Sequence, residues 1–189
     1  PLGIVLALRA RIGIMEIFSS DIQVDHNLDE VTQGYRERLR DLGPLRQRLR
    51  GGGSISVRGY RPNELGDVTQ VDDRLDSGGL RQWEASAELR VPLTTNVGTV
   101  WFVDVGDVTR EKRFRFSQPQ TTLGFGLRYK TLIGPVRLDF GFAPKSLQSI
   151  GADQRTRERF TQDGTPEPFD ESTIFGTGGA IHFTIGEAF

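Results

Sequence analysis

One arginine and two carboxylates are spaced so that they can form a buried ion pair. Arg58 lies shortly after a run of three glycines at residues 51–53. Glu88 and Asp104 occur downstream, each within a segment of alternating apolar and polar residues. The planar guanidinium of arginine matches the geometry of a carboxylate and binds it through two hydrogen bonds. We therefore predict that Arg58 pairs with Glu88, Asp104 or both; the alternative is a solvated arginine in a hairpin loop.

The rest of the sequence gives little support for catalysis or metal binding. The two histidines, His26 and His182, have no further ligands at metal-binding spacing, and cysteine is absent. The serines beside the glycine run have no His–Asp arrangement to activate them. Acidic residues gather at 67–76 and 167–171 together with proline and glycine, so we interpret both segments as solvated loops. We expect no enzyme activity, no metal and no cofactor.

The elements that must position Arg58 and its partners are β-strands. Strict alternation of apolar and polar residues recurs along the chain, which is typical of strands with two different faces. Six such segments occur, at residues 4–17, 82–92, 98–107, 121–130, 135–143 and 180–189. Most have roughly 9–11 residues, the length that a tilted strand needs to cross a bilayer.

The two faces of these strands suit two different surroundings. One face combines Arg, Glu and Asp with Gly, which suits a lumen wall that a loop approaches closely. The other face is apolar, and we predict that it faces lipid. Its members include Leu6, Leu8, Ile12, Trp83, Leu89, Trp101, Val103, Leu127, Leu138, Phe140 and Phe183. A soluble β-sandwich that binds a partner is the alternative with the same composition.

Short and long connections alternate between the predicted strands. Tight turns lie at residues 94–96 and 133–134. The long polar connections are residues 51–79, 108–120 and 146–178. Outer-membrane barrels have short periplasmic turns and long external loops. The sequence therefore predicts an all-β fold, an antiparallel transmembrane β-barrel. We assign residues 21–50 to an external loop; a short helix at 31–42 is the alternative for part of this segment.

The composition limits the class of protein further. The 189 residues suffice for one domain, and a formal net charge of -1 leaves no basic footprint for nucleic acid. No stretch approaches the ~20 apolar residues of a spanning helix. The sequence starts at Pro1 instead of Met, and we expect it to be a piece of a longer protein.

Several motifs, in this order and spacing, resemble the outer-membrane protein assembly factors, the bacterial surface antigen superfamily that includes the BamA and TamA insertases. The resemblance rests on residues 44–60, Glu88, residues 102–106 and 134–135, and the terminal segment 182–189. It implies a bacterial outer-membrane location and a barrel of about sixteen strands. Residues 1–189 would supply the C-terminal portion, about six strands, and the periplasmic domains that precede such barrels are absent from it.

The resemblance also implies a role for the first motif. The loop at residues 51–79 would tuck into the barrel, so that Arg58 meets Glu88 and Asp104 on adjacent strands. Gly59 would permit the backbone turn behind the arginine, and Tyr60 takes the aromatic position of the motif.

The last strand is the second site that the resemblance implies. A C-terminal aromatic strand acts as the assembly signal of outer-membrane barrels, and Phe189 fits this role. The strand would pair poorly with the first barrel strand, which opens a lateral gate, and Gly186 matches the glycine where it kinks inward. Simple closure of the barrel is the alternative for this strand.

The leading interpretation is a non-enzymatic factor that assembles or inserts outer-membrane β-barrel proteins. Its partners would be the lipid bilayer, unfolded client β-barrel polypeptides, and accessory lipoproteins or periplasmic chaperones, with no nucleic acid. A two-partner-type polypeptide secretion pore of the same superfamily carries the same motif and stays an alternative. A plain porin-like structural barrel is a further alternative, which the arginine motif disfavours.

Overall fold

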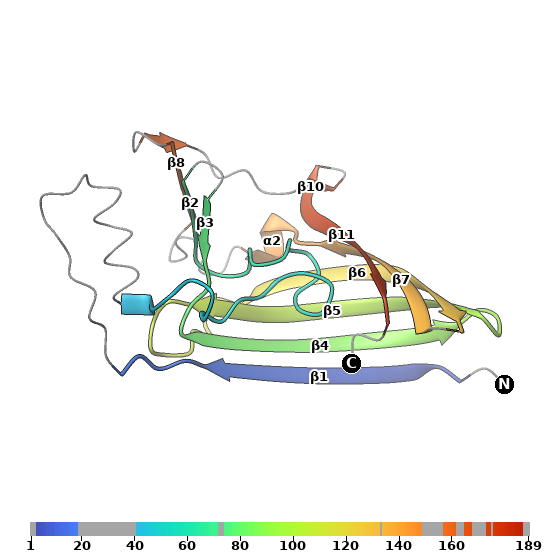
Figure 1. Cartoon of the computed structure of the whole chain (residues 1–189). Coiled ribbons are helices and arrows are strands. Elements are labelled where there is room, and N and C mark those ends of the chain that lie inside the picture. Colours follow the sequence, from blue (N-terminus) through green and yellow to red (C-terminus); the bar gives the residue numbers. More distant parts are fainter. Residues whose placement is uncertain are drawn as a thin grey trace, which may run out of the picture.

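The structure, a computed structural model, describes residues 3–18, 41–71, 74–132, 134–148, 157–161, 165–167, 173–174 and 176–186. Its main element is a seven-stranded sheet in the order β1-β4-β5-β6-β7-β11-β10, in which all neighbours are antiparallel (Figure 1). The strands are β1 (Val5–Ile14), β4 (Arg81–Pro92), β5 (Val97–Thr109), β6 (Gln120–Thr131), β7 (Gly134–Phe142), β10 (Thr173–Ile174) and β11 (Thr177–Ile185). Each of the six predicted strands corresponds to one long strand of this sheet, so the predicted antiparallel all-β fold is confirmed.

The strands alternate between a buried and an exposed face, as their sequences predict. On β4, for example, Glu88 is 1% exposed and its neighbour Leu89 is 41% exposed. Most of the residues predicted to face lipid are exposed: Leu6, Leu8, Ile12, Leu89, Trp101, Val103, Leu127 and Phe183. Trp83, Leu138 and Phe140 lie on the same face by register but are half-buried. Aromatic neighbours explain two of these, because Phe116 packs on Trp83 and Phe125 stacks on Phe140.

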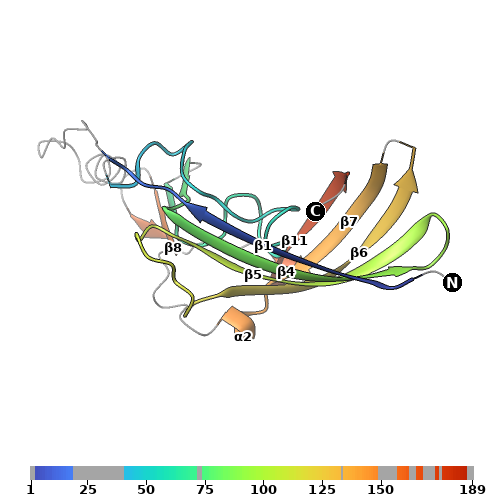
Figure 2. The same ribbon diagram turned by 90° about the horizontal axis from the view of Figure 1, so that it is seen from below.

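The sheet is curved, and its concave side holds the segment that follows the glycine run (Figure 2). We call residues 51–67 the arginine loop. Val57, Tyr60 and Leu65 of this loop form a buried apolar cluster with Val108 of β5 and Ala143 beyond β7. The apolar core of the described residues therefore lies between the loop and the concave wall, and the convex side is left to lipid.

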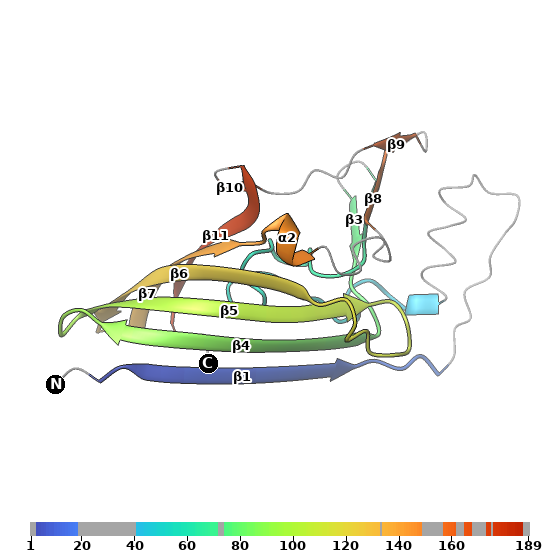
Figure 3. The same ribbon diagram turned by 180° about the vertical axis from the view of Figure 1, so that it is seen from behind.

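Two long connections contain strands that the alternation did not predict. A second sheet has the order β3-β2-β8-β9 (Figure 3). Its strands are β2 (Val68–Val71), β3 (Arg74–Ser77), β8 (Arg157–Phe160) and β9 (Pro166–Glu167). The predicted long connections at 51–79 and 146–178 therefore contain short strands that the sequence analysis did not identify. Strands of two to four residues are too short to show a period, and β2 pairs with β8 in parallel over a long sequence separation.

Helices contribute little to the described residues. The helix α2 (Lys145–Gln148) has four residues and follows β7. No helix in the described part of the chain is long and apolar enough to cross a membrane. The segment 31–42, for which a helix was the alternative to an external loop, lies almost entirely outside the described residues, of which Asp41 and Leu42 are helical.

The last strand ends earlier than its sequence predicts. Alternation continues to the terminal residue, whereas β11 runs from Thr177 to Ile185. Gly186 then has a φ of 111°, a backbone conformation that L-residues with a side chain rarely adopt. Its amide donates to the carbonyl of Pro135 at 2.8 Å, which fastens the end of the strand to β7. Phe189 lies outside the described residues.

Replacing Leu138 by arginine tests the assignment of the convex face to lipid. Leu138 sits at the middle of β7, opposite Leu127 on one side and Phe183 on the other. An arginine near the bilayer midplane should lower the free energy of unfolding in lipid by about 2–4 kcal/mol. Denaturant titration of the refolded protein measures this cost. Leu132→Arg is the control, because Leu132 is fully exposed in the turn after β6 and should tolerate the charge. Equal tolerance at both positions would contradict the lipid assignment.

Candidate functional site

The arginine loop is folded on itself before it meets the sheet. The amide of Gly53 donates to the carbonyl of Tyr60 at 2.9 Å, and the amide of Gly52 donates to the hydroxyl of Ser56 at 2.8 Å. Gly52 and Gly53 have φ angles of 93° and 95°, which strain any residue with a Cβ. The glycine run thus makes the tight turn that presents Arg58 to the concave wall.

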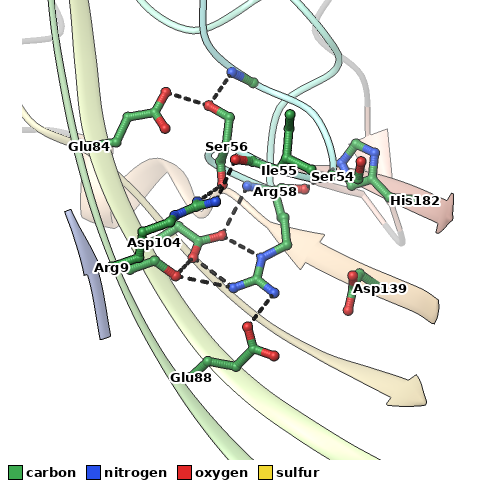
Figure 4. A network of polar contacts seen from close by, with 12 residues as sticks. Arg9, Ser54, Ile55, Ser56, Arg58, Glu84, Glu88, Asp104, Asp139 and His182 are labelled. Atoms are coloured by element: carbon green, nitrogen blue, oxygen red, sulfur yellow. Dashed lines mark hydrogen bonds and ion pairs between the residues drawn. The ribbon is translucent and has the colours of Figure 1, made fainter. Parts of the chain in front are cut away.

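Arg58 pairs with both carboxylates predicted for it (Figure 4). Its Nε and Nη2 donate to the two carboxylate oxygens of Asp104, each at 2.8 Å, and its backbone amide donates to Asp104 Oδ2 at 3.1 Å. Its Nη1 donates to Glu88 Oε2 at 3.2 Å. Arg58, Glu88 and Asp104 are 2%, 1% and 0% exposed. Burial at this level requires that each charge be paired.

Three further side chains hold Arg58 in place. The hydroxyl of Ser86 accepts from Arg58 Nη2 at 3.3 Å and donates to Asp104 Oδ1 at 2.6 Å. The ring of Phe102 lies 3.5 Å from the guanidinium carbon, a cation–π contact. His182 Nε2 is 2.9 Å from the backbone carbonyl of Arg58, which makes it the donor of that bond. The ring of Phe102 in turn packs on Gly124, where a Cβ would collide with it.

The surroundings keep Arg58 positively charged. Burial disfavours the charge, but the hydrogen bonds that Arg58 donates to Asp104 and the charges of Asp104, Glu88 and Asp139 outweigh it and raise the pKa of the guanidinium above its usual value. Since arginine is already protonated at any physiological pH, the pair is a permanent electrostatic contact and has no protonation switch at Arg58.

The arginine loop contacts all six long strands. Arg9 and Arg11 of β1 donate to the carbonyl of Ile55 at 2.7 and 2.9 Å. Ser56 donates to Glu84 of β4 at 2.5 Å. Strand β5 contributes Asp104 and β11 contributes His182, as described above. The remaining two strands approach the loop backbone through Thr122 of β6 and Gly141 of β7. The loop therefore braces the whole sheet from inside.

Two glycines allow this approach at its closest point. A Cβ on Gly141 would collide with the carbonyl of Arg58 and lie 2.7 Å from the amide nitrogen of Gly59. A Cβ on Gly59 would in turn lie 2.7 Å from the Cβ of Thr122. Distances below 3.0 Å do not occur for real Cβ atoms. Backbone therefore packs on backbone here, and the predicted role of Gly59 is best described as close packing, since it has no positive φ.

The wall carries a second group of charges next to the Arg58 pair. Asp139 of β7 accepts from Arg128 Nη1 at 2.6 Å and from Arg137 Nη2 at 2.9 Å. Glu88 joins the two groups, because its Oε1 lies 3.4 Å from Arg90 Nε and 3.5 Å from Arg128 Nη2. In the described ranges no group of three or more His, Cys, Asp or Glu is placed to hold a metal ion. The arrangement of charges is suited to holding a loop against the wall.

Sequence reasoning placed Asp139 and Phe102 on the polar face but did not connect them to Arg58. Their position in the alternation could have predicted the contact, since both side chains lie on the face of their strands that lines the wall. Ser86 and His182 also lie on that face, but a serine or a histidine in a strand does not by itself predict a contact with an arginine. Tyr60 is 7% exposed and belongs to the apolar cluster. Gly186 lies beyond β11 in the bond to Pro135, and Phe189 falls outside the described residues.

Replacing Gly141 by alanine tests whether backbone contact seats the loop. The new methyl group would displace the Arg58 carbonyl, so we expect the arginine loop to lift from the wall and to be cleaved faster by protease in the folded protein. Gly98→Ala in β5 is the matched control, because a Cβ there lies 3.4 Å from its nearest neighbour, an ordinary contact. Unchanged cleavage in Gly141→Ala would show that the loop does not depend on this contact.

Comparisons with known proteins identify the family of this chain. The Omp85 superfamily domain matches residues 4–189. A comparison with curated proteins finds no significant match. Solved structures that resemble the chain include BamA from Haemophilus ducreyi lacking POTRA domains 1–3, with 18% sequence identity and a TM-score of 0.42. That match covers 74% of this chain and 26% of the BamA chain, so the present chain spans about a quarter of that structure. The chain belongs to the Omp85 superfamily, as the motifs predict, and is the C-terminal portion of a β-barrel in the bacterial outer membrane.

Proposed function

We propose that this chain is the C-terminal part of the barrel of an outer-membrane protein assembly factor, which inserts client β-barrel polypeptides without catalysis. The arginine loop would brace the lumen wall, and the last strand would form a lateral gate toward the bilayer. The observation that carries the proposal is the loop itself. One buried arginine and its neighbours tie it to all six long strands, including the terminal one. A plain pore has no need of such a brace.

The bracing would control the position of the last strand. His182 of β11 binds the backbone carbonyl of Arg58 at 2.9 Å, and Asp104 binds the Arg58 side chain and amide. A shift of the terminal strand away from the wall must therefore break a bond to the residue that the wall holds most firmly. The arginine loop would set how far the strand can move while the barrel stays folded.

The exposed edge of β11 is suited to receive a client strand. β11 pairs with β7 from Gly179 to Ile185, while β10 covers its other edge only at Thr177 and Gly178. Within the described residues the rest of that edge has no strand partner. Unpaired backbone groups on an edge strand form a template for another strand, a mode of binding called β-augmentation. Clients would be unfolded outer-membrane polypeptides, with accessory lipoproteins or periplasmic chaperones as further partners.

A disulfide across the proposed gate tests this function. In the full-length protein, a cysteine at Ile181 of β11 would be linked to a cysteine on the first barrel strand. We expect the link to block client insertion into lipid vesicles and a reductant to restore it. The control links Ile181 to Phe140, its partner in the β11–β7 ladder, which should leave insertion unchanged. Normal insertion by the cross-linked gate would contradict the proposal and leave barrel closure as the role of β11.

A cross-link is a cleaner probe than a substitution at Gly186. The sequence predicts that a β-branched residue there would stiffen the strand and slow insertion. Because Gly186 has a φ of 111°, any side chain would also strain the backbone. Loss of function would then not be separable from loss of stability.

Reconstitution of Arg58 variants separates the assembly factor from the secretion pore. We expect Arg58→Ala to slow insertion of client barrels, and Arg58→Lys to restore it only in part, because lysine cannot form the two-bond pair with Asp104. The assay follows two fates of a labelled substrate, integration into the vesicle membrane and release across it. Integration supports an assembly factor. Release of one soluble polypeptide without integration would contradict the assembly factor and support the secretion pore.

A further inference from the structure

The end of β5 carries a carboxylate on the convex face of the sheet. Asp107 lies opposite Trp83 in the β4–β5 ladder and has the parity of Trp101 and Val103, which are exposed toward lipid. An unpaired carboxylate on the lipid side of a barrel is unfavourable. Asp107 is nevertheless only 1% exposed, so another part of the chain must cover and neutralise it.

The connection after β5 supplies that cover. Arg115 Nε and Nη2 donate to the two carboxylate oxygens of Asp107 at 2.7 and 3.0 Å. The same guanidinium donates to Asp67, at the end of the arginine loop, with Nη2 to Oδ1 at 3.1 Å. Arg115 is 8% exposed. This ion pair holds the connection against the rim of the sheet, at the end where the long loops lie.

The segment held by the Arg115 ion pair places three aromatic side chains on the outer surface. The indole nitrogen of Trp83 donates to the carbonyl of Arg115 at 3.2 Å. The ring of Phe116 lies 5.2 Å from that of Trp83, and the ring of Phe114 lies 5.6 Å from that of Phe116. Phe116 remains 62% exposed. Aromatic rings at this level are suited to the interface between lipid headgroups and acyl chains.

Two cations adjoin these rings. Lys112 and Arg113 are exposed and directly precede Phe114. Glu111 is the exposed carboxylate beside them, and Arg110 is engaged with Thr69 at 3.3 Å and the carbonyl of Asp76 at 2.8 Å. Since Arg115 is neutralised by its carboxylates, the exposed charges of this segment are two cations and one carboxylate. We call Trp83, Lys112, Arg113, Phe114 and Phe116 the rim patch.

We propose that the rim patch binds the phosphate-bearing headgroup of an anionic lipid in the outer leaflet. The aromatic rings would lie at the acyl boundary, and Lys112 and Arg113 would bind the phosphate, as cations near a membrane surface do. Charge complementarity and continuity with the lipid-facing surface favour a lipid as the occupant. The proposal depends on the membrane location of the barrel and is independent of whether it inserts clients.

Quenching of Trp83 fluorescence by brominated lipids tests this site. The full-length protein is reconstituted, in a variant whose only tryptophan is Trp83, into bilayers that mix phosphatidylglycerol with phosphatidylcholine. One lipid or the other is brominated. We expect the anionic lipid to quench Trp83 more strongly at equal mole fraction. Lys112→Gln with Arg113→Gln should lower the selectivity for it by roughly fivefold for each cation removed.

Lys130→Gln is the matched control, because Lys130 is an exposed lysine at the opposite end of the sheet, beside the short turns. It should leave the selectivity at Trp83 unchanged. Both variants alter exposed side chains, and the heat-modifiable mobility of the folded barrel checks that each is intact. Equal quenching by the two lipids in the parent protein would overturn the proposal. An equal loss of selectivity in the control would overturn it too, because net charge and not the rim patch would then attract the lipid.

Discussion

The burial of Arg58 between Asp104 and Glu88 is the constraint on which the rest of this structure depends. A guanidinium in this position is stable only if carboxylates meet it in a fixed geometry, so β4 and β5 must align their registers to bring both acids to one point. The loop backbone must then lie on the wall, which requires glycine at 59 and 141. The two glycines and the position of the loop follow from that one contact.

Strand β5 carries one buried carboxylate on each of its two faces. Asp104 faces the lumen and Asp107 faces the outer rim, three positions along the strand and on opposite faces. Each is neutralised by an arginine from a different connection, Arg58 from inside and Arg115 from outside. Asp67 links the two, because the arginine loop ends where Arg115 binds. Arg115 thus joins the end of the arginine loop, through Asp67, to the outward carboxylate of Asp107.

The features that could be predicted from the sequence are those that depend on local alternation and on the pairing of opposite charges. Six long strands show a period of two over most of their length, and the parity of Glu88 and Asp104 identifies the partners of Arg58. The second sheet was not predictable, because β2 and β8 are four residues each and pair across a long separation. The outward parity of Asp107 could be read, but its partner Arg115 lies in a connection whose path no period determines. The end of β11 at Ile185 depends on the backbone of Gly186, which alternation does not reveal.

A double-mutant cycle on Arg58 and Asp104 tests most directly whether this pair organises the wall. Arg58→Met, Asp104→Leu and the double variant would be compared with the parent by equilibrium unfolding in lipid vesicles. If the pair is the central contact, the double variant should lose less free energy of unfolding than the sum of the losses of the two single variants. The coupling should reach at least about 2 kcal/mol, because Arg58→Met removes the arginine that pairs with Asp104, and Asp104→Leu leaves Arg58 with Glu88 as its one remaining carboxylate partner among the described residues. Additive costs, with coupling near zero, would mean that the loop is held by its other contacts, and would contradict the account.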